Sequence, residues 1–403
     1  MSGRDVVKLA VLRVGRVADV EDRVVPYRLL DADGREVEPV TDYLREMAGR
    51  GSRATTLRSY AYDLLRWFRF LWAVEVAWDR AQRVDARDFL LWVSNAPKPR
   101  RSRRVQRATP PPGSVNRITG KPYPGATLSL ASHNHNETVA RAFYDYHATM
   151  GRGPVINPFP VSNRRPHAHH NPMQPWPRQR TGLYRRRQPQ TIPRAIPDGL
   201  FNDLFAKMDS DRDRALLAMF VSAGPRAEEL LGLVRDRVNV GDQLIGVIRK
   251  GSRALQWLPA SPDSFVWLRC YQHQMRGVVP AGRNDPVWWT LRRPFRPLTY
   301  HACLAVLRRA NALLGTNWSL HDLRHTACSR MAQDPDMPLT DVQWVMGHAR
   351  ISTTQRYMIP GQDEVIARAR AHFARRNEPV PPPPPTPGYR PEVLDALLGR
   401  RLP

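Results

Sequence analysis

The chain has 403 residues, of which 42% are hydrophobic, so it is long enough to build more than one domain with a buried core. Lysine and arginine total 62 against 37 aspartates and glutamates, which gives a net charge of +25 and predicts a polyanionic partner. No run of residues approaches the roughly 18 consecutive apolar positions that span a bilayer, and the N-terminus lacks the pattern of a signal peptide. The composition therefore excludes a membrane-spanning protein and favours nucleic acid over an anionic membrane as the partner.

The cysteines and histidines give no sign of a metal centre. Cys270, Cys303 and Cys328 lack paired ligand spacing, and we expect buried thiols in a reducing cytosol, hence a cytoplasmic protein. The run His167-Ala-His169-His170 has no partners at ligand spacing, so a solvated basic linker is the preferred interpretation. We therefore expect neither a metal nor another cofactor.

The N-terminal part is predicted to be a short extension followed by a helical domain. Residues 1–40 alternate weakly and contain the turn signal Asp33-Gly34, which favours a hairpin. A helical pattern starts at Thr41, and a second helix is expected over 85–94 with Asp85 in a capping position. A third is expected over 126–150. The apolar face of the first helix is formed by Leu57, Tyr60, Leu64, Trp67, Phe68 and Leu71. A basic loop rich in proline and glycine, residues 97–125, interrupts this domain of 41–150.

The remaining segments divide by composition. Residues 151–193 are rich in proline, arginine and histidine without periodicity, and are predicted to be a basic linker. A second domain is expected over 194–376. Residues 377–403 form a tail that begins with a polyproline spacer and ends with a short amphipathic helix over 390–401.

Four patterns in the second domain carry candidate chemistry. In AGPRAEELLGL (223–233), the turn Gly224-Pro225 is expected to lead into a helix with Arg226 in its first turn and Glu229 one turn later. In QLIGVIRKGSRALQWLPA (243–260), two strand-like runs are joined at Lys250-Gly251-Ser252. Each pattern alone is typical of an ordinary surface.

The other two patterns are helical. In SLHDLRHTACSRMA (319–332), Ser319 is a plausible N-cap, and His321, Arg324 and His325 share one helical face. A zinc pair is disfavoured there because the HExxH glutamate is missing and Arg324 would repel a cation. In DVQWVMGHARISTTQRYM (341–358), Gly347 ends a short helix, and Tyr357 follows His348 by nine positions.

Taken together, these patterns resemble the tyrosine recombinases of the phage-integrase class. The family order of Arg, Lys, His-x-x-Arg, Gly-His and Tyr is present in full. The family box TGLRxxELLxL appears as AGPRAEELLGL, HxLRHT as HDLRHT, and LGHxxxxTTxxYxH as MGHARISTTQRYMI. Departures are Pro225 in place of leucine, isoleucine after Met358, and no second lysine after Gly251, which leaves Arg249 and Arg253 as rivals of Lys250.

The resemblance implies a fold and a role for each residue. The fold is mainly α with a small antiparallel β-sheet in the catalytic domain, two domains forming a DNA clamp, with 41–150 as the helical core-binding (SAM-like) domain. Tyr357 would be the nucleophile that forms a covalent 3′-phosphotyrosine. The implied supporting set is Arg226, Arg324 and His348 around the phosphate, Lys250 as general acid, His321 for proton transfer at the nucleophile, and Glu229 as a holder of an arginine or histidine.

The expected partner is double-stranded DNA at recombination sites. Basic residues proposed to contact the DNA backbone are Arg58, Arg66, Arg164, Arg165, Arg178 and Arg180. The leading interpretation is a bacterial site-specific recombinase (integrase) that acts as a homotetramer on DNA through a Holliday junction, with an accessory directionality factor as a further candidate partner. Whether it serves a mobile genetic element or a chromosome-dimer system is left open by the sequence. A type IB-like topoisomerase and a catalytically degenerate DNA-binding regulator are the alternatives.

Overall fold

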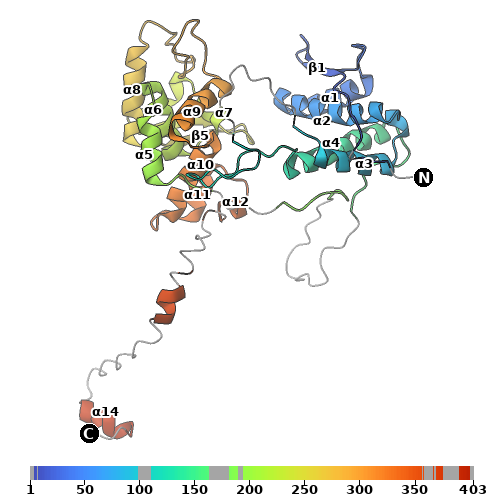
Figure 1. The fold of residues 1–403 in the computed structure, drawn as a ribbon. Coiled ribbons are helices and arrows are strands. Elements are labelled where there is room, and N and C mark those ends of the chain that lie inside the picture. Colours follow the sequence, from blue (N-terminus) through green and yellow to red (C-terminus); the bar gives the residue numbers. More distant parts are fainter. Residues whose placement is uncertain are drawn as a thin grey trace. The chain divides into compact units, whose positions relative to one another are not determined.

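The computed structural model describes residues 4–6, 8–98, 110–162, 181–188, 194–355, 357, 366, 369–374 and 390–399 (Figure 1). Contacts divide the chain into two compact units, Met1–Thr191 and Ile192–Pro403. Among the described residues, no helix is long and apolar enough to cross a membrane. In the same residues, no group of three or more His, Cys, Asp or Glu side chains is arranged to hold a metal ion. The run His167-Ala-His169-His170 lies outside them.

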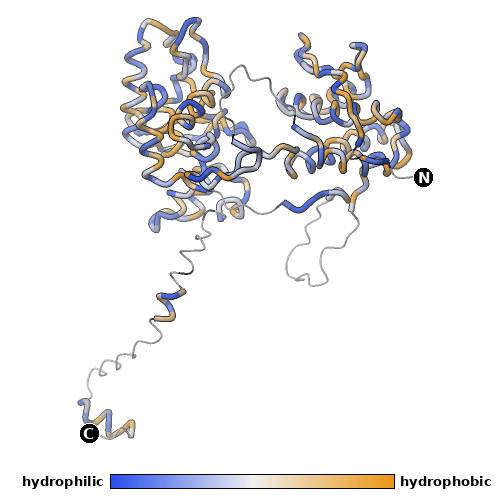
Figure 2. The backbone as a smooth tube through the Cα atoms, viewed as in Figure 1, coloured by the Kyte–Doolittle hydropathy of each residue, from blue (hydrophilic) through white to orange (hydrophobic). Residues whose placement is uncertain are grey.

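The first unit consists of a hairpin and a group of helices. Its elements are β1 (Arg16–Asp19), β2 (Tyr27–Leu30), α1 (Glu38–Gly49), α2 (Ala54–Ala73), a 3-10 turn (Trp78–Arg80), α3 (Arg83–Asn95) and α4 (Leu130–Thr149). Apolar and polar stretches alternate along the helices of both units (Figure 2), as amphipathic helices require. The predicted apolar face of α2 is buried at Leu57, Leu64 and Leu71.

Aromatic side chains fill the core of this unit. Trp67 of α2 lies in edge contact with Phe89 of α3, at a centroid distance of 4.9 Å. Its indole N–H donates to the hydroxyl of Tyr144 at 3.0 Å, and that hydroxyl donates to the Trp78 carbonyl at 2.9 Å. The indole N–H and the hydroxyl in this core therefore both have hydrogen-bond partners. Asp85 caps α3 from its third helical position, because its carboxylate accepts the Gln82 N–H at 2.8 Å.

The N-terminal hairpin packs into the same core. Strands β1 and β2 are antiparallel, and Val25 and Leu29 are buried with the residues of α1 to α4. The connection between the strands is residues 20–26, whereas Asp33-Gly34 lies in the following turn, where the Asp31 N–H donates to the Arg35 carbonyl at 2.9 Å. The predicted turn is present, but it joins β2 to α1 rather than the two strands.

Part of the segment predicted as linker is attached to α4. The Tyr184 N–H donates to Glu137 Oε1 at 2.9 Å, and Asn134 exchanges two hydrogen bonds with the main chain of Arg186 at 2.9 and 3.0 Å. Residues 181–188 therefore belong to the packing of the first unit. The outer bounds predicted for the linker, like the other predicted domain bounds, stay predictions.

The second unit combines helices with a small antiparallel sheet. Its elements are α5 (Asp198–Ala206), α6 (Asp211–Ala223), α7 (Ala227–Leu231), a 3-10 turn (Arg235–Arg237), β3 (Val238–Asn239), β4 (Leu244–Ile248), β5 (Leu255–Pro259), α8 (Pro262–Gln274), α9 (Tyr300–Leu314), α10 (Leu320–Gln333), α11 (Leu339–Met346), α12 (Ile351–Gln355) and, in the tail, α14 (Pro391–Leu397). The sheet order is β3-β4-β5. The predicted fold class, mainly α with a small antiparallel sheet in the second domain, is confirmed.

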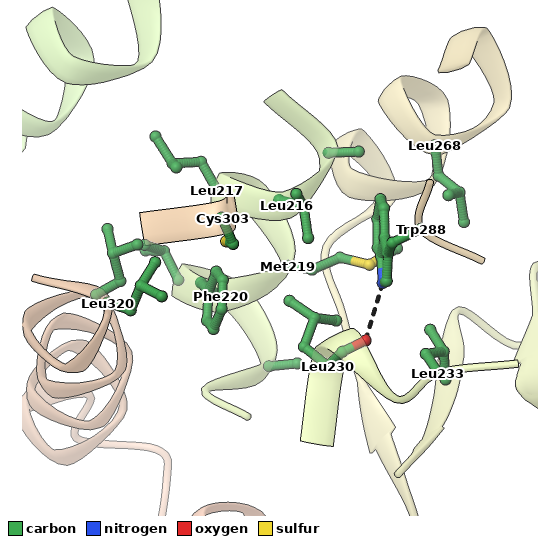
Figure 3. Packing of buried hydrophobic residues seen from close by; sticks show 14 of the residues in the cluster. Leu216, Leu217, Met219, Phe220, Leu230, Leu233, Leu268, Trp288, Cys303 and Leu320 are labelled. Atoms are coloured by element: carbon green, nitrogen blue, oxygen red, sulfur yellow. Dashed lines mark hydrogen bonds between the residues drawn. The ribbon is translucent and has the colours of Figure 1, made fainter. Parts of the chain in front are cut away.

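Helix α6 is the centre of the second core, because it packs against both α8 and α10. Figure 3 shows its buried side chains together with Trp288, whose indole N–H donates to the Leu230 carbonyl at 2.9 Å. That bond holds α7 against the core.

Of the three cysteines, Cys303 and Cys328 are buried, but Cys270 is exposed on α8. The expectation of three buried thiols was therefore wrong for Cys270, which lies on the solvent side of an amphipathic helix.

Candidate active site

Arg226 stands at the junction of two helices. Gly224 ends α6 in the left-handed conformation with φ 60°, and α7 starts at Ala227. Arg226 is the N-cap of α7, with an extended backbone at φ −72° and ψ 152°. The expectation that it lies within the first helical turn was wrong, because the left-handed Gly224 and the proline after it delay the start of the helix. At this junction the guanidinium is about one-third exposed.

Glu229 connects Arg226 to the β4–β5 hairpin. Its carboxylate accepts the main-chain N–H and the guanidinium of Arg226, each at 2.9 Å. It also accepts the Arg249 guanidinium at 3.1 Å and the Lys250 main-chain N–H at 3.1 Å. One buried carboxylate therefore joins the start of α7 to the end of β4.

Burial and hydrogen bonding shift the pKa of Glu229 in opposite directions. Burial alone raises the pKa of a carboxyl, but the hydrogen bonds from Arg226 and Lys250, with the nearby charge of Arg249, outweigh it and lower the pKa of Glu229. The carboxylate is thus ionised at neutral pH. An ionised carboxylate is the form that holds two guanidinium groups in place.

Lys250 begins the tip of the hairpin. Its side chain is half-exposed and its ammonium lies 3.2 Å from Glu228 Oε2. The neighbouring Arg249 points inward, where it also donates to Gln256 Oε1 at 2.6 Å and to the Val345 carbonyl. Arg253 is exposed at the other side of the tip. The sequence left Arg249 and Arg253 as alternatives to Lys250. Of these two, Arg249 is bound by hydrogen bonds inside the unit and does not face the hairpin tip.

Arg324 lies on the floor of the site. Ser319 caps α10 as predicted, with Asp322 completing a capping box. Arg324 is only 4% exposed, and its guanidinium donates to the carbonyls of Gly224 and Met346, at the C-terminal ends of α6 and α11. Burial and the nearby Arg226 lower the pKa of Arg324 to about 10, so it stays charged at neutral pH. Helix C-terminal carbonyls carry partial negative charge and stabilise this buried cation.

A hollow of about 360 Å³ opens above this floor. It is lined by Pro225, Arg226, Ala227, Glu228, Lys250, Tyr300, Leu320, His321 and Arg324. The predicted Arg226, Lys250, His321 and Arg324, which are far apart in the sequence, thus face one space. Three of them carry a positive charge, so the hollow suits an anion such as a phosphate.

His348 directly follows Gly347, the residue that the sequence predicted to end a helix. Gly347 ends α11 with φ 59°, and the His348 ring nitrogen Nδ1 is hydrogen-bonded to Thr354 Oγ1 at 2.9 Å. Burial, together with the charges of Arg324 and Arg226, lowers the pKa of His348 to about 4. The ring is therefore neutral at physiological pH, which leaves it as a hydrogen-bonding group rather than a charge.

Tyr357 is half-buried beside two histidine rings. Its hydroxyl is hydrogen-bonded to His325 Nδ1, and its ring lies 6.3 Å from the His348 ring with an interplanar angle of 14°. The His325 ring lies 4.1 Å from the His321 ring. The spacing of His321, Arg324 and His325 predicted the correct helical face for His325 but indicated no role for it. The signal available was its position next to Arg324 and one turn after His321.

The arginines predicted to contact the DNA backbone differ from one another in their surroundings. Arg58 is exposed on α2, with its guanidinium 5.8 Å from the centre of the Tyr62 ring. Arg66 donates to both Asp63 and Asn136 at 2.7 Å, so part of its hydrogen-bonding capacity serves the first unit itself. The others lie outside the described residues: Arg164, Arg165, Arg178 and Arg180.

Comparisons with known proteins agree on one family. Residues 200–362 match the model "Phage integrase family", and residues 40–109 match "Phage integrase, N-terminal SAM-like domain". Tyrosine recombinase XerD of Xanthomonas axonopodis pv. citri is 27% identical over 46% of this chain and 65% of its own length. Tyrosine recombinase XerC of Azotobacter vinelandii is 34% identical over 43% of this chain and 56% of its own length. The chain thus spans less than two-thirds of these relatives.

Solved structures show the same fold. The Tn1549 transposon integrase in complex with circular intermediate DNA aligns with a TM-score of 0.55 and 14% identity, over 83% of this chain and 98% of that one. A lambda integrase dimer bound to a COC′ core site aligns with a TM-score of 0.53 and 13% identity, over 79% of this chain and 76% of that one. At these identities the likeness establishes the fold.

Proposed function

We propose that this chain, which belongs to the phage integrase family of tyrosine recombinases, is a site-specific DNA recombinase. It would cut and rejoin double-stranded DNA through a covalent 3′-phosphotyrosine and a Holliday junction. The observation that carries the proposal is the hollow lined by Arg226, Lys250 and Arg324, with Tyr357 on the same unit. Cationic donors around a hollow that is open to solvent, with a phenol available as nucleophile, suit phosphodiester exchange.

In the proposed reaction, the Tyr357 oxygen attacks a backbone phosphorus and the bond to the 5′ oxygen breaks. Arg226 and Arg324 would hold the non-bridging oxygens, since a guanidinium is always charged and offers fixed donors. The neutral ring of His348 would add a hydrogen bond. Because the phosphodiester is replaced by a phosphotyrosine of similar energy, a 5′ hydroxyl can reverse the step and join a new strand.

Proton transfers complete this chemistry. Lys250 would give a proton to the leaving 5′ oxygen, and its place on a hairpin tip supports that role, since the tip can reach toward bound DNA. His321, which lines the same hollow, was predicted to serve proton transfer at the nucleophile. Glu229 would position Arg226 without touching the DNA.

The proposed partner is a pair of recombination sites in DNA. The Tn1549 and lambda integrases are described in complex with DNA, which supports DNA as the ligand of this chain as well. The net charge of +25 supports it independently, because phosphate neutralisation drives non-specific DNA binding. A homotetramer on two sites and an accessory directionality factor stay predictions. Binding to chromosomal DNA would place the protein at the bacterial nucleoid.

The test is covalent trapping on DNA. The Tyr357→Phe protein is used to select bound duplexes from a random library, and nicked versions of these are offered to wild type and variant. We expect a protein–DNA adduct with wild type and none with Tyr357→Phe. An adduct with the variant would show that Tyr357 is not the nucleophile. Binding without an adduct in either protein favours the DNA-binding regulator, and relaxation of supercoiled DNA without exchange favours the topoisomerase.

A further inference from the structure

The hydroxyl of Tyr357 has a specific partner on α10. Nδ1 of His325 is hydrogen-bonded to it, and the two rings lie 5.4 Å apart with an interplanar angle of 42°. His325 directly follows Arg324, so the helix that supplies the buried arginine of the site also supplies a base to the phenol. Its side chain is half-buried, whereas His321 is exposed.

The phenol needs such a partner if it is to attack. An unperturbed tyrosine titrates near ~10, so at neutral pH the attacking oxygen still carries its proton. A base within hydrogen-bond reach lowers the barrier by taking the proton as the new bond forms. Among the described residues, the rings in contact with His325 include those of His321, on its own helix, and Tyr357. The ring is therefore in contact with the reacting oxygen itself.

We propose that His325 is a catalytic residue that accepts the proton of Tyr357 during strand cleavage. The inference rests on the proposed recombinase function and deepens it. As the Tyr357 oxygen forms its bond to phosphorus, the hydroxyl proton passes to Nδ1 of a neutral His325, and the bond from phosphorus to the 5′ oxygen breaks. The leaving oxygen takes its proton from the general acid. In the rejoining step a 5′ hydroxyl attacks, and the His325 imidazolium returns the proton to the departing phenol.

The contact also assigns different parts to the two histidines of this helical face. His321 lines the hollow together with Lys250 and Arg324, and thus faces the proposed phosphate space. His325 lies one turn further along α10, at the phenol. The role predicted for His321 at the nucleophile accordingly passes to His325.

The experiment separates proton acceptance from mere positioning. In His325→Asn the side-chain oxygen is able to accept the hydrogen bond of the phenol but not its proton, whereas His325→Phe is able to do neither. His321→Asn tests the competing acceptor, and His273→Asn, on the exposed face of α8, is a matched control. Each protein is given the selected nicked duplexes in excess, so that DNA binding is saturated, and the single-turnover rate of adduct formation is measured from pH about 5 to about 9.

We expect the wild-type rate to fall toward low pH, because a protonated imidazole accepts no proton. In His325→Asn the rate falls by about 100-fold or more, and its acidic limb is replaced by a rise with pH toward the titration of the phenol. His325→Phe behaves in the same way. His273→Asn retains the wild-type rate and profile.

Two results would contradict this inference but not the proposed function. One is a His325→Asn rate close to that of wild type. The other is a slower rate with an unchanged acidic limb, which indicates that His325 only positions the phenol. Loss of the acidic limb in His321→Asn, with His325→Asn retaining it, gives the role to His321. No adduct from wild type on DNA that it binds, or an adduct from Tyr357→Phe, contradicts the proposed function and this inference with it.

Discussion

The buried carboxylate of Glu229 holds Arg226 twice, through its main-chain N–H and through its guanidinium, each at 2.9 Å. Because the first bond caps α7 and the second orients the side chain, the start of the helix and the direction of the arginine are set by one residue. The same carboxylate binds Arg249, which is only 5% exposed. This relationship makes Glu229 a structural requirement of the site.

We expect Glu229→Gln to destabilise the second unit. The substitution leaves the buried Arg249 without its counter-charge, and breaking a buried ion pair from one side typically costs about 3 kcal/mol. The matched control is Glu228→Gln, because Glu228 is a half-exposed neighbour in the same helix. Urea unfolding measures both free energies. Equal values for the two variants would contradict the assigned importance of Glu229.

Lys250→Ala is expected to slow cleavage of normal DNA by at least about 100-fold, as loss of a general acid does. A substrate whose bridging 5′ oxygen is replaced by sulfur needs no protonation of its leaving group, and should restore the rate. Arg253→Ala, on the same hairpin tip, is the control and is expected to behave as wild type on both substrates. If sulfur fails to rescue Lys250→Ala, the lysine does not act as the acid.

His348 is expected to make stability depend on pH. Burial and the nearby Arg324 and Arg226 lower its pKa to about 4 in the folded chain, against ~6.5 for an ordinary histidine. Between these values the unfolded chain binds more protons, so this contribution to the free energy of unfolding rises with pH from about 4 and is complete above ~6.5. His348→Gln should remove this contribution, and the exposed His273→Gln should retain it. Urea unfolding at several pH values measures the difference.

Gly224→Ala is expected to disturb both the fold and the site. Gly224 has φ 60°, and an added Cβ would lie 2.7 Å from Sδ of Met346. Left-handed strain and this overlap together should cost about 2 kcal/mol. Because the Gly224 carbonyl accepts from Arg324, adduct formation should slow as well. Gly251→Ala, with nothing within 4 Å of the added atom, is the control in both assays. Equal unfolding free energies for the two variants would contradict the expectation.

Local signals predicted much of the fold. The spacing of Leu57, Leu64 and Leu71 predicted α2, Ser319 predicted the start of α10, and Gly347 predicted the end of α11. Each is a property of a few neighbouring residues, because helix periodicity and capping operate over one or two turns. The start of α7 was predicted less well, since the left-handed Gly224 and the following Pro225 delay it to Ala227, after Arg226.

The sequence by itself determined which side chains are available for the chemistry: the ordered arginines, lysine, histidines and tyrosine, recognised by type and spacing. Only the tertiary structure decided how they pair. It turns Arg249 inward to Glu229, 20 positions away, and brings His325 to Tyr357, 32 positions away. Such partners are chosen by the packing of whole elements around a core, and no periodicity within one helix or strand records that packing.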